Sequence, residues 1–400
     1  MFKTVFTQVF VNAIYEWEEI VTEGLAKIII PKRELFQRPD QTYEPAWSPV
    51  FYNPLMKPCR DLTVLVNYSY FGNKSYFFID SLAGTGVRGI RLGLETNGYG
   101  IINDVDPIAY YYMLRNIELN NLSQRVQPYM CESNALFNNF TFSGVIVDYI
   151  DIDPYGSPIP FIDSAVKTLG KNSLLGVTAT DTAPLVCSHR HKTLRRYNIE
   201  CMKTDFEKEL GLRILIYNLI IRSASQDVCL KPLISYYHKH YYRVFFETTR
   251  SGSKAFENVS KCRGYLWYCP KTLERGFVKE INTIENNCSE GEQIVAGPLW
   301  ICNLGDTDFL KKLIDNVEKF ANYIDLNLLK QLKILLYEYR IEQPYIRYDK
   351  FFSKIGRNMI PIEEFINIIK KQGFEASRSH FDPRGVRTNA PVKILREIFS

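Results

Sequence analysis

The stretch "DSLAGTGVRGIRLG", residues 80–93, decides the fold. It follows an apolar run, Tyr76–Asp80, that is typical of a strand, and it opens the helical pattern Val87–Glu95. A Gly-x-Gly-x-x-Gly pattern that begins at Gly84 forms the turn between them. Glycines let a ligand approach the backbone closely, and the first turn of a helix offers unpaired N–H groups. The stretch therefore predicts a nucleotide-like ligand, with a plain tight turn as the alternative.

Short apolar runs alternate with helical patterns from residue 76 to about residue 181. This alternation predicts βαβ units, and hence an α/β fold with a mostly parallel sheet and helices on both faces. Ligands of such sheets bind at the carboxyl ends of the strands. The expected strands are Tyr76–Asp80, Gly100–Asn103, Val126–Cys131, Gly144–Asp153 and Leu174–Thr180, and the expected helices are Val87–Glu95, Pro107–Asn120 and Ser157–Leu169.

Composition and charge narrow the class of protein. The chain has 400 residues, is 46% hydrophobic and 23% charged, and carries a net charge of +5, which is ordinary for a folded protein and argues against disorder. Such a small positive surplus suits a polyanionic partner only where the basic residues cluster. No apolar run reaches the roughly 18 residues of a membrane span, so we expect no membrane partner. Nothing in the chain calls for an obligate protein partner.

Cysteine usage and the N-terminus indicate a compartment. Nine cysteines without a recognisable signal peptide favour a reducing environment over a disulfide framework, and we expect a cytoplasmic protein. Apolar residues recur at helical spacing over residues 2–13 and predict a short helix packed on the body of the protein.

The segments around the alternating pattern complete two expected domains. A strand over residues 23–31 and a helix beginning near Arg60 precede the pattern. The pattern changes near residue 250, which predicts a first domain over residues 1–250 and a smaller α+β domain over residues 251–400. Further expected elements are a helix over Phe206–Ser225, strands over Leu233–His240 and Tyr242–Thr249, and helices over Asp308–Tyr323 and Leu326–Tyr339.

Acidic residues follow the second and third expected strands. Asp104 ends the second strand, where a carboxylate accepts the hydroxyl groups of a ribose. Because the glycine pattern and Asp104 also match the dinucleotide fingerprint, a nicotinamide cofactor is an alternative at this point. Glu132 and Ser133 follow the third strand, in position to meet an adenine or to form an ordinary polar loop. The predicted cofactor site comprises Asp80, Gly84, Gly86, Asp104, Glu132 and Ser133.

The stretch "DIDPYGSP", residues 151–158, ends the fourth expected strand and predicts the chemistry. An amino group on an aromatic base is a poor nucleophile until acceptors hold its protons, and Asp153 and the carbonyl of Pro154 are such acceptors. Proline stiffens the turn, and Tyr155 offers a ring for stacking on a base. An enzyme that transfers hydride has no use for such a turn, so the sequence favours a methyl donor over a nicotinamide cofactor. A capped turn before Ser157 is the structural alternative.

Six blocks in this order resemble the tRNA (guanine-26, N2)-dimethyltransferase family, and most closely its archaeal members. The resemblance runs from about Glu23 to the C-terminus. The blocks are "FYNPLMKPCRDLTVLV" (51–66), "DSLAGTGVRGIR" (80–91), "NDVDP" (103–107), "DIDPYGSP" (151–158), "GVTATDTAPL" (176–185) and "GFEASRSHFDPRGVRTNAP" (373–391).

The resemblance implies a Rossmann-like methyltransferase fold, S-adenosylmethionine as the methyl donor and the exocyclic N2 of guanine 26 in tRNA as the acceptor. It implies that Arg60 and Arg88 contact the donor. It also implies that Phe51 and Tyr155 flank the target base and that Asp153 is the catalytic carboxylate. Family members usually have Phe where this chain has Tyr155, and since a tyrosine still stacks, we expect activity.

Family members also differ from this chain in their cysteines. Many carry two Cys-x2-Cys pairs in the region of Cys269 and Cys288, where this chain has Thr272 and Gly291 in the partner positions. With two of four ligands missing, tetrahedral zinc would be incomplete, and we predict no structural metal. The alternative is that Cys262 supplies a third zinc ligand.

Two basic segments predict tRNA contacts. The run "SHRHKTLRRYN", residues 188–198, follows the fifth strand and contains no acidic residue, as a phosphate-binding loop requires. The segment Lys370–Arg396 contains seven Lys or Arg residues interleaved with aromatic side chains. A solvated surface is the alternative for both segments, and Asp181 either caps a turn or lines the base pocket. The predicted tRNA contacts are Arg190, Lys192, Arg195, Arg196, Arg378, Arg384 and Arg387.

Two other classes of protein remain open. One is a nucleic-acid methyltransferase that acts on adenine N6 or cytosine N4, because the Asp-Pro-aromatic turn suits those amines as well. The other is a non-catalytic RNA-binding protein that has kept the fold, against which the intact Asp104 and Asp153 argue.

Overall fold

The computed structural model describes residues 13–283, 286–320 and 322–399. The helix predicted near the N-terminus falls on residues outside this part of the chain, apart from its last position. The protein divides into two compact units. The first comprises Met1–Pro154, Asp163–Val177 and Lys312–Leu329, and the second comprises Tyr155–Ile162, Thr178–Lys311 and Lys330–Ser400. The chain passes between the units several times, which differs from the single boundary predicted near residue 250.

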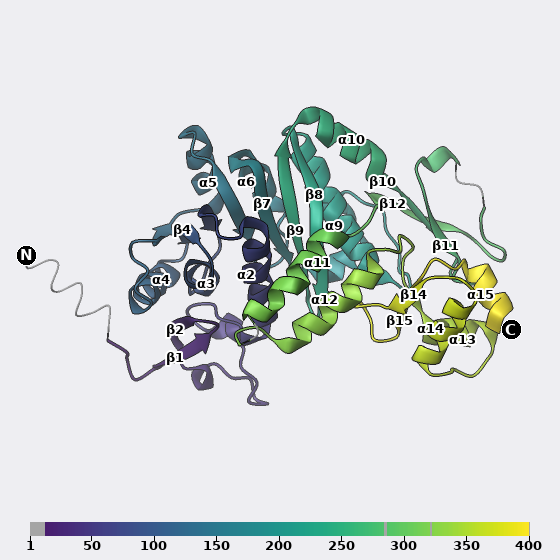
Figure 1. Cartoon of the computed structure of the whole chain (residues 1–400), viewed down its shortest axis with the longest axis horizontal. Coiled ribbons are helices and arrows are strands. Elements are labelled where there is room, and N and C mark those ends of the chain that lie inside the picture. Colours follow the sequence, from purple (N-terminus) through teal and green to yellow (C-terminus); the bar gives the residue numbers. More distant parts are fainter. Residues whose placement is uncertain (1–12, 284–285, 321, 400) are drawn as a thin grey trace, which may run out of the picture. The chain divides into compact units, whose positions relative to one another are not determined.

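Parallel strands in the order β5-β4-β3-β6-β7 form the sheet of the first unit, with every neighbouring pair parallel. Figure 1 labels β4 and β7 of this sheet. All the strands predicted for this segment are present, and β3 and α3 have the predicted bounds. The strands are β3 (Tyr76–Asp80), β4 (Gly98–Asp104), β5 (Val126–Met130), β6 (Val147–Ile152) and β7 (Leu169–Ala179), and the helices between them are α3 (Val87–Glu95), α4 (Pro107–Leu119), α5 (Ser133–Phe142) and α6 (Ile159–Thr168).

Helices cover both faces of this sheet, as the sequence predicted. Successive side chains of a strand point to opposite faces. Phe78 of β3 faces α3, since a methyl group on Gly89 would lie 3.2 Å from its ring. Its neighbour Phe77 stacks on Phe140 of α5, with 5.8 Å between ring centroids. The sequence did not predict α5, because its asparagines and threonine have low helix propensity.

A hairpin and a long helix precede the sheet. Where the sequence predicted one strand, β1 (Glu18–Glu23) and β2 (Ala26–Pro31) pair antiparallel. Gly24 makes the turn with a positive φ of 60°, which favours glycine. Helix α2 (Lys57–Phe71) follows after the short helices η1 (Arg33–Leu35), η2 (Pro45–Trp47) and η3 (Pro54–Met56).

The second unit contains an antiparallel pair and two three-stranded sheets. The pair is β8 (Val228–His238) and β9 (Tyr241–Arg250), next to helix α9 (Glu207–Ala224). The sheets have the orders β11-β10-β12 and β13-β15-β14. Their strands are β10 (Arg263–Tyr268), β11 (Arg275–Val278), β12 (Ile294–Trp300), β13 (Ile346–Arg347), β14 (Ala376–Arg378) and β15 (Gly385–Thr388).

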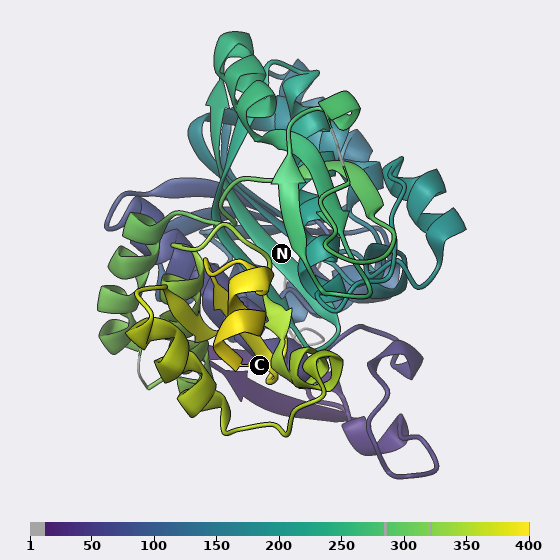
Figure 2. The ribbon, with the colours of Figure 1, turned by 90° about the vertical axis from the view of Figure 1, so that its right-hand side faces the viewer.

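Three short helices gather near the C-terminus, and Figure 2 turns this end of the chain toward the viewer. Helices α13 (Tyr348–Ile355), α14 (Ile362–Lys371) and α15 (Val392–Phe399) are held by an aromatic cluster in which the rings of Phe365 and Phe399 lie 4.7 Å apart. The remaining helices are α7 (Thr182–Leu185), α8 (Arg190–Tyr197), α10 (Gly252–Cys262), η4 (Ile281–Thr283), α11 (Thr307–Asn316), η5 (Val317–Phe320) and α12 (Leu326–Glu338).

Three disulfides join cysteines of the second unit. They link Cys187 to Cys201, Cys262 to Cys302 and Cys269 to Cys288. The expectation that the cysteines stay reduced is therefore wrong for these six. Their spacing carries no pattern that reveals pairing, since the partners are 14, 40 and 19 residues apart and meet only through the fold.

Candidate active site

The glycine loop after β3, here called the glycine cradle, is buried at Gly84 and Gly86 and is closely packed. Gly84 and Gly86 have positive φ values of 53° and 80°, which glycine adopts without strain. A methyl group on Gly84 would lie 2.9 Å from the backbone oxygen of Phe51, so a side chain would close the space over the loop. Asp104, at the end of β4, accepts a hydrogen bond of 2.9 Å from the Gly84 N–H. A nucleotide-like donor fits this end of the sheet because a half-buried carboxylate, that of Asp104, stands at the rim of the loop.

One buried amide holds the loops of three neighbouring strands together. Asn103 of β4 donates to the backbone oxygens of Ser81 and Cys131 at 3.0 and 2.9 Å, and its own oxygen accepts from Cys131 N–H. The Ser133 hydroxyl donates to the same Ser81 oxygen at 2.8 Å. Ser133 thus has a structural bond in this structure, while Glu132 is exposed and caps α5 through the Ala135 N–H. Their predicted contact with an adenine stays a prediction.

Arg88, at the start of α3, joins the carboxylates at the end of β6. Its Nη2 donates to Asp153 Oδ2, and its Nε lies 3.4 Å from Asp151 Oδ1. From the other side, Nη1 donates to the hydroxyl of Thr63 at 2.8 Å and faces the sulfur of Cys59. The guanidinium is therefore fixed by groups from both α2 and β6. Any contact of Arg88 with the donor, which the resemblance implies, would have to share this side chain with Asp153.

Three carboxylates face this single arginine. Asp80 is buried at the end of β3 and accepts from Gly89 N–H at 3.1 Å. Burial raises the pKa of Asp80 to about 7, against the opposing effect of Arg88, and the charges of Asp151 and Asp153 add to the rise. The raised pKa favours the neutral form of Asp80, and this form lowers the excess of negative charge around Arg88.

The turn that the sequence predicts to be catalytic begins with Asp153 and Pro154 at the carboxyl end of β6. The Asp153 side chain is 17% exposed, so the carboxylate reaches solvent while Arg88 holds one of its oxygens. Buried Asp151 is held by the hydroxyl of Tyr149, and its backbone oxygen accepts from the Ser81 hydroxyl at 2.7 Å. The residues of this strand end are therefore fixed to the glycine loop.

Within the second unit, the residues that follow Pro154 form a pinned turn. Tyr155 is 69% exposed, which leaves its ring available for stacking. Gly156 exchanges two hydrogen bonds with Thr180, of 2.6 and 2.9 Å. The Ser157 hydroxyl lies 3.1 Å from that of Tyr197, which donates to Asp181. Asp181 therefore holds this turn through Tyr197, which supports the structural alternative for this residue.

Arg60 lies in a buried network of charges. Its Nε and Nη2 donate to Glu23 at 2.6 and 2.5 Å. Arg91 donates to the same Glu23 at 3.0 Å, to Asp61 at 2.6 Å and to Glu95 at 2.8 Å. Burial opposes the charge of Glu23, but the two arginines outweigh it and lower the pKa of Glu23 to about 2. In this structure Arg60 fastens the β1–β2 hairpin to α2, and its predicted contact with the donor stays a prediction.

The predicted tRNA contacts fall into three groups. Arg190, Lys192 and Arg195 of α8 are exposed. Arg196, Arg378 and Arg384 are paired with Asp181, Glu363 and Asp349, with Arg378 and Arg384 well exposed. Arg387 is 1% exposed. It bonds to Glu209, Glu338 and two backbone oxygens. Arg387 is thus a structural residue, and its prediction as a phosphate contact is corrected.

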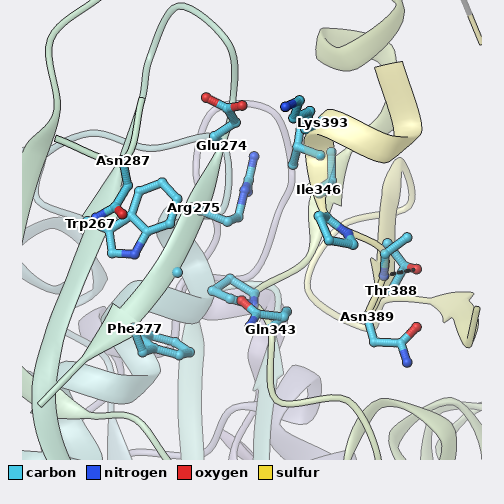
Figure 3. A pocket seen from close by; sticks show the side chains of 15 residues that line it. Trp267, Glu274, Arg275, Phe277, Asn287, Gln343, Ile346, Thr388, Asn389 and Lys393 are labelled. Atoms are coloured by element: carbon cyan, nitrogen blue, oxygen red, sulfur yellow. Dashed lines mark hydrogen bonds between the residues drawn. The ribbon is translucent and has the colours of Figure 1, made fainter. Parts of the chain in front are cut away.

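The second unit also contains a cavity of about 360 Å³ (Figure 3). Trp267 and Phe277 line it on one side, Thr388 and Asn389 on the other. Arg275 projects into it but is bound to Asp205 at 2.8 Å and to the Tyr345 oxygen at 2.8 Å. None of the predicted site residues is among the residues that line this cavity.

The described residues contain no cluster of three or more His, Cys, Asp or Glu side chains that suits a metal ion. Cys262, Cys269 and Cys288, which raised the question of zinc, are all in disulfides. In the same part of the chain, no helix has the length and apolar character needed to cross a membrane.

Sequence reasoning missed several residues of the site. Asp151 was quoted but given no role, although alternation along β6 places it on the same side as Asp153. Thr63 and Cys59 lie one turn apart on α2, so both face Arg88. Asn103 directly precedes Asp104. No pattern distinguishes these residues from ordinary core positions, because their roles depend on contacts with distant parts of the chain.

The parallel sheet, its glycine cradle and the acidic strand ends define a Rossmann-like methyltransferase. A solved complex of Trm1 from Pyrococcus horikoshii with S-adenosyl-L-methionine has the same fold, with a TM-score of 0.81 at 29% identity over 95% of this chain and 99% of that one. The chain belongs to the N2,N2-dimethylguanosine tRNA methyltransferase family, whose sequence model matches residues 24–400.

Individual relatives agree with this assignment. A tRNA (guanine(26)-N(2))-dimethyltransferase of Sulfolobus acidocaldarius is 35% identical over 383 residues, which are 94% of this chain and 96% of that protein. The enzyme of the same name from Methanospirillum hungatei is 32% identical over 388 residues, 95% of this chain and 98% of its own. The family resemblance and the fold class predicted from the sequence are confirmed.

Proposed function

We propose that this protein transfers methyl groups from S-adenosylmethionine to the exocyclic N2 of guanine 26 in tRNA, giving N2-methylguanosine and N2,N2-dimethylguanosine. The observation that carries the proposal is the Asp153-Pro154 strand end, held by Arg88 beside the glycine cradle. Membership of the family selects this base and position among the amines that such a turn accommodates.

The residues have distinct roles in this proposal. Gly84, Gly86 and Asp104 hold the donor, which supplies an activated methyl group. Asp153 and the Pro154 carbonyl accept hydrogen bonds from the amine, and Asp153 takes the proton that the nitrogen loses. Because guanine 26 is stacked inside folded tRNA, it has to be extruded at a cost of a few kcal/mol, part of which stacking on Phe51 and Tyr155 offsets.

The tRNA itself would be held by basic side chains of the second unit. Arg190, Lys192 and Arg195 are exposed and together form a small positive patch on α8. Phosphate neutralisation by such residues supplies much of the affinity for RNA. We place the protein in the cytoplasm, where tRNA is available.

Methyl transfer from labelled S-adenosylmethionine to an unmodified tRNA transcript tests the proposal. We expect label on a transcript with guanine at position 26, recovered as N2-methylated guanosine, and no label when position 26 is adenine. Asp153→Ala should reduce the rate by at least 10²-fold. Equal labelling of both transcripts would assign the target to another base, and failure to bind the donor would favour a non-catalytic RNA-binding protein.

A further inference from the structure

Asp151 lies beside the catalytic carboxylate without being in position to meet a substrate. Its side chain is 0% exposed, whereas that of Asp153 is 17% exposed. Asp151 lies in β6 and Asp153 directly follows the strand, two residues further on, and both share Arg88, through Nε for Asp151 and Nη2 for Asp153. A fully buried carboxylate is costly unless it is paired and hydrogen-bonded, and Arg88 together with the Tyr149 hydroxyl meets that need.

We propose that Asp151 is a positioning residue that acts through Arg88 and sets how strongly Asp153 is held when it receives the amine proton. This inference rests on the proposed function. During transfer, the nitrogen gains a methyl group, one N–H bond breaks with its electron pair staying on nitrogen, and the proton passes to Asp153. The positive charge of Arg88 stabilises the ionised form of Asp153 and so disfavours its protonation. This effect is weaker when Arg88 also binds Asp151.

The geometry shows why Arg88 is shared. Thr63 of α2 binds Nη1 at 2.8 Å and keeps the guanidinium from turning, so its two remaining edges face the two carboxylates of β6. Other titratable and charged groups also surround the cluster. They are Asp80 of β3, Tyr149 of β6, and Cys59 and Arg60 of α2.

Asp151→Asn removes the shared charge and keeps the shape of the side chain. Arg88 then binds Asp153 more tightly, which makes its carboxylate a weaker proton acceptor. We expect the acid limb of the pH–rate profile to move down by about one pH unit and kcat at neutral pH to fall about tenfold. The pKa of Asp80 should also fall in this variant, because Asp80 loses the negative charge of Asp151 as a neighbour. The acid limb therefore moves to lower pH whichever of the two carboxyl groups, Asp80 or Asp153, controls it.

Asp148→Asn is the matched control. Asp148 lies on the same strand, and its carboxylate accepts from the Phe77 N–H at 2.8 Å, which an asparagine oxygen can also do. We expect wild-type kcat and an unmoved acid limb for this variant. The affinities of both variants for S-adenosylmethionine and tRNA, measured by calorimetry and filter binding, should match those of the wild type.

The outcomes separate the inference from the proposed function. If the wild type does not methylate the guanine 26 transcript, the proposed function fails first. If the wild type is active and Asp151→Asn keeps the wild-type acid limb, even with lowered stability or activity, Asp151 is merely structural and the inference is overturned. A downward shift in Asp151→Asn that is absent in Asp148→Asn supports it.

Discussion

Arg88 Nη2 donates a hydrogen bond to Asp153 Oδ2, so the helix after the glycine loop holds the carboxylate that we propose to be catalytic. The same guanidinium reaches Asp151 and Thr63. A lysine is a single point charge and cannot make these contacts together. For Arg88→Lys we therefore expect Asp153 to be held less tightly.

The expected result for Arg88→Lys is an acid limb displaced to higher pH, the reverse of the shift for Asp151→Asn. We also expect kcat at saturating donor to fall at least tenfold, because the Asp153 carboxylate loses the contact that fixes its orientation, and this loss outweighs its greater affinity for a proton. A pH–rate series with guanine 26 tRNA measures both. Arg33→Lys is the control, because Arg33 pairs with Glu19 at a half-exposed site. If the acid limb of Arg88→Lys moves to lower pH instead, Arg88 does not hold Asp153 in the way described.

Arg91 is the centre of the buried network in the first unit. Its side chain is 0% exposed and contacts Glu23, Asp61 and Glu95. Arg91→Met leaves these carboxylates with one cation fewer and should lower the free energy of unfolding by about 3–5 kcal/mol. Urea unfolding measures this loss. Arg33→Ala removes a surface ion pair and should cost less than about 1 kcal/mol, so equal losses for the two variants would be inconsistent with the network.

Exposed and buried arginines of the second unit should respond differently. Arg190→Gln removes one surface charge from α8, and we expect weaker tRNA binding with a salt dependence smaller by about one phosphate contact. Arg387→Gln should lower stability while leaving that salt dependence unchanged, because its guanidinium is enclosed by Glu209 and Glu338. Filter binding over a range of salt concentrations distinguishes the two variants. A reduced salt dependence in Arg387→Gln would show that Arg387 contacts a tRNA phosphate after all.

The pair of His380 and Glu338 predicts an acid-sensitive step in stability. Burial opposes the charge of Glu338, but His380 and Arg387 outweigh it and lower its pKa to about 2 from an ordinary 4.5. A carboxyl group whose pKa is lower in the folded protein stabilises the fold above its ordinary pKa, and this contribution disappears as pH falls toward the folded value. We therefore expect the melting temperature of Glu338→Gln to fall less than that of the wild type as the pH is lowered from 4.5 to 2. Thermal unfolding over this pH range measures the difference.

Much of the first unit followed from local patterns, because each strand and helix there carries its own period and each polar strand end comes directly after its strand. The positions of Asp104, Asp153 and the glycine loop at strand ends could be predicted for that reason, while their roles stay predictions. The role of Arg387 could not, since a basic residue in a basic segment looks the same whether it faces solvent or Glu209. The disulfides and the role of Asp151 likewise depend on which distant residues meet, which periodicity does not encode.

The amide of Asn103 joins the ends of β3, β4 and β5 through Ser81 and Cys131. We therefore expect these three loops to become ordered together. A donor that arrives at them has little chain entropy to remove, so its affinity reflects the contacts it makes. Calorimetry would then register a binding heat with only a small contribution from loop ordering, and the amides of the three loops would exchange with solvent together.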